Sequence, residues 1–153
     1  MSDFNYQFSK YFKLHEVAPP SLIKQRGLQT VELFDFRYAK AIDGFRDFFD
    51  TSVYMNNYYW GGNKSNRGLR HPNTTVGSVL SQHKFGRAMD CNIKGLTADQ
   101  VRQQILDNQE YFLKLGWTTI EDGRFAPTWN HIDMRVNLPN IGTWNKDFRI
   151  VTA

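Results

Sequence analysis

Two histidines and one aspartate are the side chains of this sequence best suited to bind a metal ion. His83 and Asp90 lie seven positions apart, and His131 follows later in the chain. Imidazole nitrogen and carboxylate oxygen both bind zinc at about 2 Å, and three protein ligands with one open position are typical of catalytic zinc. Zinc bound in this way lowers the pKa of a water ligand to about 7 and polarises a carbonyl group. The three residues therefore predict hydrolysis by a metal-activated water.

The sequence around His131 predicts a strand with further polar side chains beside the metal. Side chains alternate between the two faces of a strand, so Trp129, His131, Asp133 and Arg135 share one face. A core face of this kind would bury polar groups that each need a partner. We therefore expect it to form the floor of a solvent-filled cleft. There Trp129 either lines a substrate groove or packs as an ordinary aromatic residue.

A polar loop before His83 holds three further candidates for substrate binding. Arg67 and Arg70 are suited to bind a peptide carboxylate, because a guanidinium group forms two parallel hydrogen bonds with it. His71 is suited to contact the substrate or to stabilise an oxyanion. The alternative for each residue is an ordinary solvated loop side chain. Long loops in small domains are usually functional or disordered, which keeps all three as candidates.

The local sequence indicates how His83 and Asp90 reach the same cleft. Gly86 lies between them and favours a turn. In residues 87–93 the side chains alternate between two faces, so that Asp90 and Cys91 lie on opposite faces of a half-buried strand. A loop that turns into a strand at this point offers His83 from the loop and Asp90 from the strand.

The remaining pattern predicts an α+β fold. Apolar residues recur at helical spacing over residues 31–49. Thr97 and Gln100 match a capping box that begins a second helix, and Gly116 is suited to end it. Strands are expected at residues 51–59, 87–93, 117–121 and 128–136, the last two as a hairpin. This order predicts a small, mainly antiparallel sheet packed against helices.

The length of 153 residues predicts a single domain over residues 1–153. Residues 1–30 are expected to be an irregular N-terminal segment, since Pro19 and Pro20 interrupt them. Residues 137–153 are expected to form a C-terminal tail without regular structure.

Charge and hydropathy exclude several kinds of partner. The net charge is +4, and the basic residues are scattered rather than clustered. This distribution argues against nucleic-acid binding and fits an affinity for anionic polymers such as a cell wall. No apolar run approaches the roughly 20 residues needed to cross a bilayer, and the start of the chain lacks the features of a signal peptide. We therefore expect no membrane partner and synthesis in a cytoplasm.

Residues 81–90 read Ser-x-His-x-x-Gly-x-Ala-x-Asp, and residues 129–133 read Trp-x-His-x-Asp. Together these motifs resemble the signature of the zinc D-alanyl-D-alanine carboxypeptidase family. That family includes bacterial carboxypeptidases, the D-Ala-D-Ala dipeptidases of vancomycin resistance and phage endolysins that cut L-alanyl-D-glutamate bonds; the Hedgehog signalling domain shares its fold. The resemblance implies a Hedgehog/DD-peptidase-like fold, a peptidoglycan peptide substrate, and one Zn²⁺ bound by His83, Asp90 and His131.

One position departs from the family pattern. Many relatives place an acidic general base three residues before the last histidine, and Thr128 stands there in this chain. Three interpretations follow. Glu121 on the neighbouring strand is the base; or Asp133 is the base or only orients a histidine; or the protein binds zinc without efficient hydrolysis.

The leading hypothesis from the sequence is a zinc peptidase that cuts peptidoglycan stem peptides. The resemblance implies a phage or bacterial source, with synthesis in the bacterial cytoplasm and action in a virion or at the cell wall during lysis. The second hypothesis is a virion structural or binding module that keeps the metal site without turnover and contacts other virion proteins. A third is a Hedgehog-like interaction domain.

Overall fold

The computed structural model describes residues 2–136 and 149–151. Its centre is a five-stranded sheet in the order β1-β2-β4-β3-β5, in which every pair is antiparallel except β3 with β5. The strands are β1 Val53–Tyr54, β2 Ala88–Ile93, β3 Thr119–Glu121, β4 Asn130–Asp133 and β5 Arg149–Val151. The α-helices are α1 Leu14–Val17, α2 Pro20–Arg26, α3 Tyr38–Phe49, α4 Ala98–Asp107 and α5 Gln109–Leu115. These elements confirm the predicted α+β class with a mainly antiparallel sheet.

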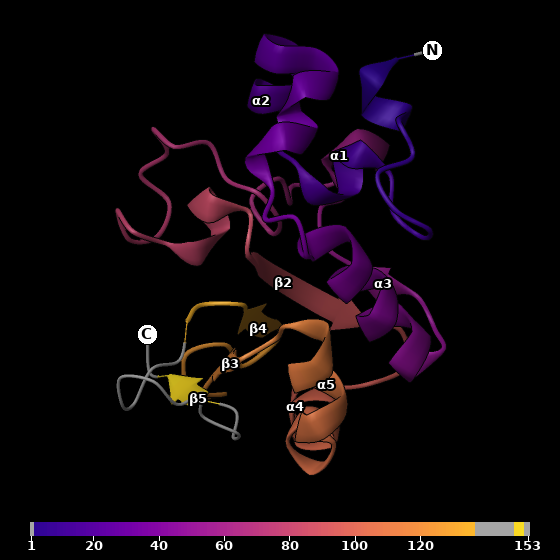
Figure 1. The fold of residues 1–153 in the computed structure, drawn as a ribbon, viewed down its shortest axis with the longest axis vertical. Helices are drawn as coiled ribbons and strands as arrows, with labels where there is room; N and C mark the ends of the chain where they lie inside the picture. The colour runs from indigo at the N-terminus through magenta and orange to yellow at the C-terminus, as the bar shows by residue number, and fades with distance from the viewer. Residues whose placement is uncertain (1, 137–148, 152–153) are drawn as a thin grey trace.

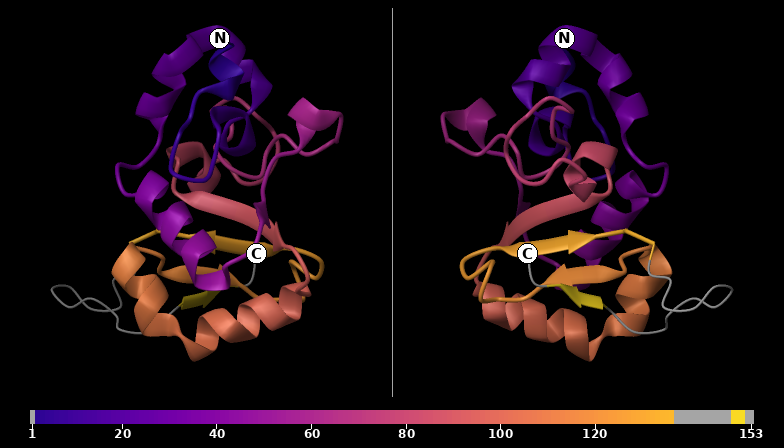
Figure 2. Two further views of the ribbon diagram at one scale, coloured as in Figure 1. Left: turned by 90° about the vertical axis from the view of Figure 1, so that its right-hand side faces the viewer. Right: turned by 90° about the vertical axis from the view of Figure 1, so that its left-hand side faces the viewer.

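Helices lie at both ends of the molecule, and α3 lies beside the sheet between them (Figure 1). Figure 1 shows α1 and α2 at one end, α4 and α5 at the other, and β2 between them. The two views of Figure 2 show the same arrangement from the sides. Aromatic packing joins α3 to α5, with the rings of Phe45 and Phe112 centred 5.6 Å apart, and the Trp117 indole donates to the Ala41 carbonyl over 3.2 Å.

The N-terminal segment 1–30 is not irregular as the sequence suggested. It folds into two short α-helices, α1 and α2, and two 3₁₀ helices, Asp3–Asn5 and Gly27–Leu33. Pro20 stands in the first turn of α2, where its missing N–H costs nothing. Helices this short show too few turns for their periodicity to be recognised. Their side chains are nevertheless part of the hydrophobic core, with Phe12, Leu14, Val17, Ala18, Leu22 and Ile23 all buried.

The helix expected over residues 31–49 begins later, at Tyr38. Asp35 accepts hydrogen bonds from the backbone N–H and the guanidinium group of Arg37, and its own carbonyl accepts from the Tyr38 N–H. This turn sets the start of the helix. Of the apolar residues that recur at helical spacing, Tyr38, Ile42 and Phe45 are buried, and Phe34 and Phe49 are half-buried against the core.

The second predicted helix is confirmed at its ends and interrupted in the middle. Thr97 and Gln100 form the capping box, and Gly116 ends α5 with a φ of 104°. Asn108 separates α4 from α5 because its side chain donates to the Gln104 carbonyl, which a helix would otherwise use.

The strands are shorter than predicted, and one was not expected. Only Val53 and Tyr54 of residues 51–59 pair with the sheet, since Asn56 next bonds to the Glu16 and Ala18 carbonyls of the N-terminal segment. The predicted hairpin is present as β3 and β4. Residues 149–151 of the expected tail form β5, and the rest of residues 137–153 lies outside the described residues. Within the described ranges, no helix is long and apolar enough to span a bilayer.

Candidate metal centre

His83 is presented by a short 3₁₀ helix, Gln82–Phe85, that leads into β2. The Ser81 hydroxyl accepts from the His83 N–H over 3.4 Å at the start of this turn. Gly86 ends it with a φ of 64°, and a Cβ there would lie 2.5 Å from both the Leu33 carbonyl oxygen and the Phe34 Cα. Glycine alone meets both demands, so Gly86 lets the loop reverse closely over the neighbouring backbone.

Asp90 and His131 are placed by the register of two paired strands. β2 and β4 are antiparallel, and Asp90 lies directly opposite His131. Residues directly opposite in a sheet project from the same face. The alternation predicted for β2 is confirmed, because Met89, Cys91 and Ile93 point into the hydrophobic core on the other face. The strand is not half-buried as expected, since all its residues except Asn92 are buried.

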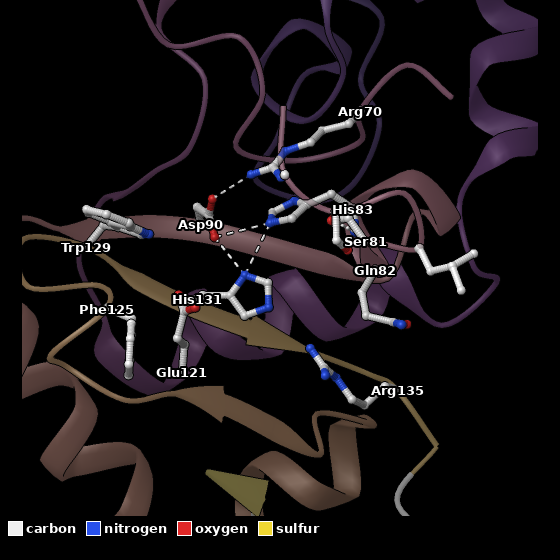
Figure 3. A pocket seen from close by; sticks show the side chains of 13 residues that line it. Arg70, Ser81, Gln82, His83, Asp90, Glu121, Phe125, Trp129, His131 and Arg135 are labelled. Carbon is white, nitrogen blue, oxygen red and sulfur yellow. Dashed lines mark hydrogen bonds and ion pairs between the residues drawn. The ribbon is translucent and has the colours of Figure 1, made fainter. Parts of the chain in front are cut away.

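The three predicted ligands converge. One ligand atom from each of His83, Asp90 and His131 lies within 4.8 Å of the others. His83 Nε2 is 3.2 Å from both Asp90 Oδ1 and His131 Nδ1, and the last two atoms are 2.8 Å apart (Figure 3). Ligand atoms on a tetrahedral zinc at about 2 Å would be roughly 3.3 Å apart. The group therefore has the size that a divalent metal requires.

Hydrogen bonds fix both histidines in the tautomer that leaves one ring nitrogen free to bind a metal. His83 Nδ1 donates to the Gly68 carbonyl over 2.7 Å, which leaves the Nε2 lone pair facing the group. His131 Nε2 donates to Asp133 over 2.8 Å, which leaves Nδ1 facing it. Two imidazole lone pairs and a carboxylate oxygen thus meet at one point, an arrangement that needs a cation.

Burial and neighbouring groups strongly shift the pKa values of all three side chains. Burial alone would raise the pKa of Asp90, but His83 and His131 outweigh it and hold that pKa well below its usual range. Burial lowers the pKa of His83. Burial opposes protonation of His131 as well, yet its hydrogen bonds to Asp133 and Asp90 raise its pKa to about 9. A proton on His131 can therefore supply the cation without metal, and metal must displace it.

The metal group opens into a cavity of about 390 Å³. Its walls combine aromatic, aliphatic and charged side chains around His83, Asp90 and His131; they include Arg70, Leu80, Ser81, Gln82, Glu121, Phe125, Trp129 and Arg135. Trp129 lines the cavity, which is one of the two placements that the sequence left open for it, and Phe125 lies on the same side (Figure 3). The mixture of apolar walls and a few charged groups is typical of a small-molecule or peptide site.

Of the three loop residues proposed to bind substrate, only one borders the cavity. Arg70 borders the cavity, but its guanidinium group donates to the Asn66 carbonyl over 2.7 Å and to Asp90 Oδ2 over 3.1 Å, so it supports the ligand carboxylate. Arg67 donates to the Asn92 side chain, outside the cavity lining. His71 also lies outside and bonds to Gln25 over 3.2 Å. The structure therefore gives Arg67 and His71 no place in this cavity, because both are bound to other segments.

The two carboxylates proposed as general base differ in access. Asp133 is fully buried and does not line the cavity; its oxygens accept from His131 and from Arg135. Of the two roles that the sequence left open for Asp133, the structure gives it the position of an orienting residue and leaves it no access to substrate as a base. Glu121 lines the cavity, and burial raises its pKa. In the part of the chain that the structure describes, its carboxylate forms no hydrogen bond and is free to take a proton.

Arg135 is a cavity residue whose role the sequence did not reveal. Its Nε and Nη2 bond to Asp133, while the structure gives Nη1 no partner among the described residues. Its side chain is 30% exposed, compared with 12% for Arg70. Figure 3 shows the guanidinium group directed toward the His131 ring. Strand alternation already placed Arg135 on the ligand face, but only the structure shows that it keeps a free edge.

Comparison with known proteins gives no relative for this chain. No family model, curated protein or solved structure matches it. The geometry of the site and the two sequence motifs therefore carry the functional proposal.

Proposed function

We propose that this protein is a zinc-dependent peptidase that hydrolyses peptide bonds in peptidoglycan stem peptides. The observation that carries the proposal is the convergence of two imidazole lone pairs and one carboxylate oxygen at the wall of an accessible cavity. Nitrogen-rich sites of this kind favour zinc over calcium or magnesium. The resemblance to zinc DD-peptidases supports the substrate class and a Hedgehog/DD-peptidase-like fold.

In this proposal one residue of the cavity acts as the base and two groups behind it hold the ligand histidines. Zinc bound here would activate a water and polarise the scissile carbonyl. Glu121 accepts the proton of the attacking water and returns it to the leaving amine, so no net proton is gained or lost. Asp133 and the Gly68 carbonyl keep the two histidines in their ligand tautomers.

Arg135 replaces the loop arginines as the group proposed to bind an acidic part of the substrate. Arg135 lines the cavity and its Nη1 has no hydrogen-bond partner among the described residues, whereas Arg67 is outside the cavity and Arg70 is held by Asp90. Trp129 and Phe125 supply an apolar wall for the peptide. The bond that is cut is D-Ala-D-Ala, L-Ala-D-Glu or a cross-bridge. Cleavage of any of these three bonds would suit a phage endolysin, which acts at the cell wall during lysis.

Peptidoglycan digestion tests the proposal. Purified protein loaded with zinc is expected to release muropeptides from cell walls, and a chelator should abolish the release. Glu121→Gln should lower the rate by about 10² to 10⁴-fold, the usual effect of losing a general base. Glu110→Gln is the matched control, since Glu110 lies on the α5 surface in an exposed pair with Lys114. Unchanged walls at high enzyme concentration would refute the peptidase, and full activity of Glu121→Gln would refute the base.

A module without turnover is the second candidate function. Thr128 favours it, because this residue occupies the position of the usual acidic base and its side chain is exposed outside the cavity lining. Such a protein would bind zinc and peptidoglycan peptides, or neighbouring virion proteins, with no muropeptide release. Muropeptide release distinguishes the two functions, and zinc binding without release is the result expected for the module.

A further inference from the structure

A second groove, of about 220 Å³, lies between the N-terminal segment, α3 and β1. It shares no lining residue with the metal cavity. Its lining is rich in aromatic residues and contains one carboxylate and one guanidinium group; the residues are Tyr11, Phe12, Glu16, Arg46, Ser52, Val53, Tyr54 and Trp60.

Two of its aromatic side chains are exposed although they are large and apolar. Trp60 is 62% exposed and Tyr54 is 48% exposed. Trp60 is nevertheless held in place, since the buried His15 ring meets it edge to face at 4.8 Å and stacks on Tyr59 at 4.3 Å. Aromatic residues that are both supported and exposed are typical of binding surfaces.

The polar groups of the groove have opposite charges and are available for hydrogen bonding. Glu16 uses one oxygen, Oε2, to accept from the Lys13 N–H over 2.8 Å. The Arg46 guanidinium group lies 5.0 Å from the centre of the Tyr11 ring. Since one negative and one positive group face the same groove, the charge of Arg46 opposes a cationic ligand and that of Glu16 opposes an anionic one. A neutral ligand with many hydroxyl groups fits this charge pattern.

We propose that this groove binds a neutral oligosaccharide of β-1,4-linked sugars with the gluco configuration, such as N-acetylglucosamine. In such sugars the ring hydroxyls are equatorial, so the flat faces carry only C–H groups that pack on Trp60 and Tyr54. The hydroxyls at the ring edges then donate to Glu16 and accept from Arg46. The inference rests on the groove alone and does not require the peptidase activity or bound zinc.

Titration of the full chain with chitohexaose, followed by calorimetry and by the NMR signal of the Trp60 indole, tests the proposal. Trp60→Ala and Tyr54→Ala are each expected to weaken binding about tenfold or more, the loss of an aromatic stacking contact. Phe36→Ala is the matched control, because Phe36 is 93% exposed and lies outside the groove. Glu16→Gln keeps an acceptor for Lys13 and should weaken binding less than Trp60→Ala.

The outcomes separate this inference from the proposed function. Binding that persists in a chelator and is lost in Trp60→Ala supports the oligosaccharide site, whatever the result of the digestion experiment. Absence of binding at millimolar chitohexaose would overturn it, as would equal affinity of wild type and Trp60→Ala. Tetramethylammonium is titrated in parallel; a cation that binds where the sugar does not would show a cationic ligand and also overturn the proposal.

Discussion

Asp133 and Glu121 have the same chemical group and different positions in the cavity. Asp133 is enclosed by His131 and Arg135, whereas Glu121 faces the cavity with its carboxylate unpaired among the described residues. At the scale of residues, the three metal ligands could be predicted because their motifs are short and strand alternation fixes their face. The different access of Asp133 and Glu121 to the cavity could not be predicted, because the burial of a side chain depends on segments distant in the sequence.

Asp133→Asn should weaken zinc binding by about 10- to 100-fold, the usual effect of losing a carboxylate that orients a ligand histidine. The neutral amide is a weaker acceptor for His131 Nε2 and pairs poorly with Arg135. Competition with a chromophoric chelator measures the affinity. Glu121→Gln is the control and should bind zinc as the wild type does. Equal affinity in all three proteins would contradict the orienting role of Asp133.

At the scale of elements, the turn at Gly86 and the start of α3 meet. Gly86 packs against the backbone of Leu33 and Phe34, and the Asp35 N–H donates to the Gly86 carbonyl over 3.2 Å. The sequence indicated that Gly86 turns the chain into β2, but it gave no sign of this contact. The predicted helix was therefore too long at its N-terminal end, since this packing and the Asp35 turn occupy residues that periodicity alone assigned to it.

Gly86→Ala should destabilise the protein and also weaken zinc binding, because the added Cβ meets backbone atoms and displaces the turn that carries His83. Gly95→Ala is a matched control: Gly95 also has a positive φ, of 83°, but a Cβ there meets nothing within 4 Å. Gly95→Ala should cost about 1 kcal/mol for the backbone conformation alone. Urea unfolding and zinc titration measure both effects. Equal losses of stability and of zinc affinity in the two variants would show that the close backbone contact at Gly86 does not contribute to either.

Asp35 is expected to contribute stability that depends on pH. Its hydrogen bonds to Arg37 lower its pKa below the ordinary value. A carboxylate with a lowered pKa in the folded state stabilises the protein above its unfolded pKa, and this contribution is lost as the pH falls through the folded value. Asp35→Asn should therefore lower the free energy of unfolding at pH 7 by about 1 kcal/mol. The difference from wild type should shrink below about pH 4.

Denaturant unfolding at several pH values measures this difference. Asp107→Asn, at an exposed position in α4, is the control and should change stability little. A difference between Asp35→Asn and wild type that stays constant down to pH 2 would contradict the assignment.

At the scale of the whole molecule, the core joins segments that lie far apart in the sequence. The Leu69 N–H donates to the Val17 carbonyl over 2.7 Å, and β2 pairs with β4, about 40 residues later in the chain, as well as with β1. The α+β class could be predicted from local periodicity. The participation of residues 2–30 in the core could not, because it depends on such long-range contacts and on helices too short to show a pattern.

Zinc should raise the melting temperature of the whole protein, because its three ligands come from a loop and two strands. Ligand at about 100 times its Kd adds about 2.7 kcal/mol of stability, which corresponds to a shift of several degrees for a chain of this size. Calorimetric melting with zinc and with a chelator measures the shift. Magnesium is the control and should have little effect, since it prefers oxygen ligands. No shift with excess zinc would contradict the metal site.

The direct opposition of Asp90 and His131 across β2 and β4 has a consequence for folding. A slip of one strand by a single residue would turn His131 to the far side of the sheet and separate it from Asp90. Only the correct alignment can then capture the ion, so zinc selects among competing strand pairings as the chain folds. Refolding with zinc present should therefore yield fewer misaligned molecules than refolding followed by zinc addition.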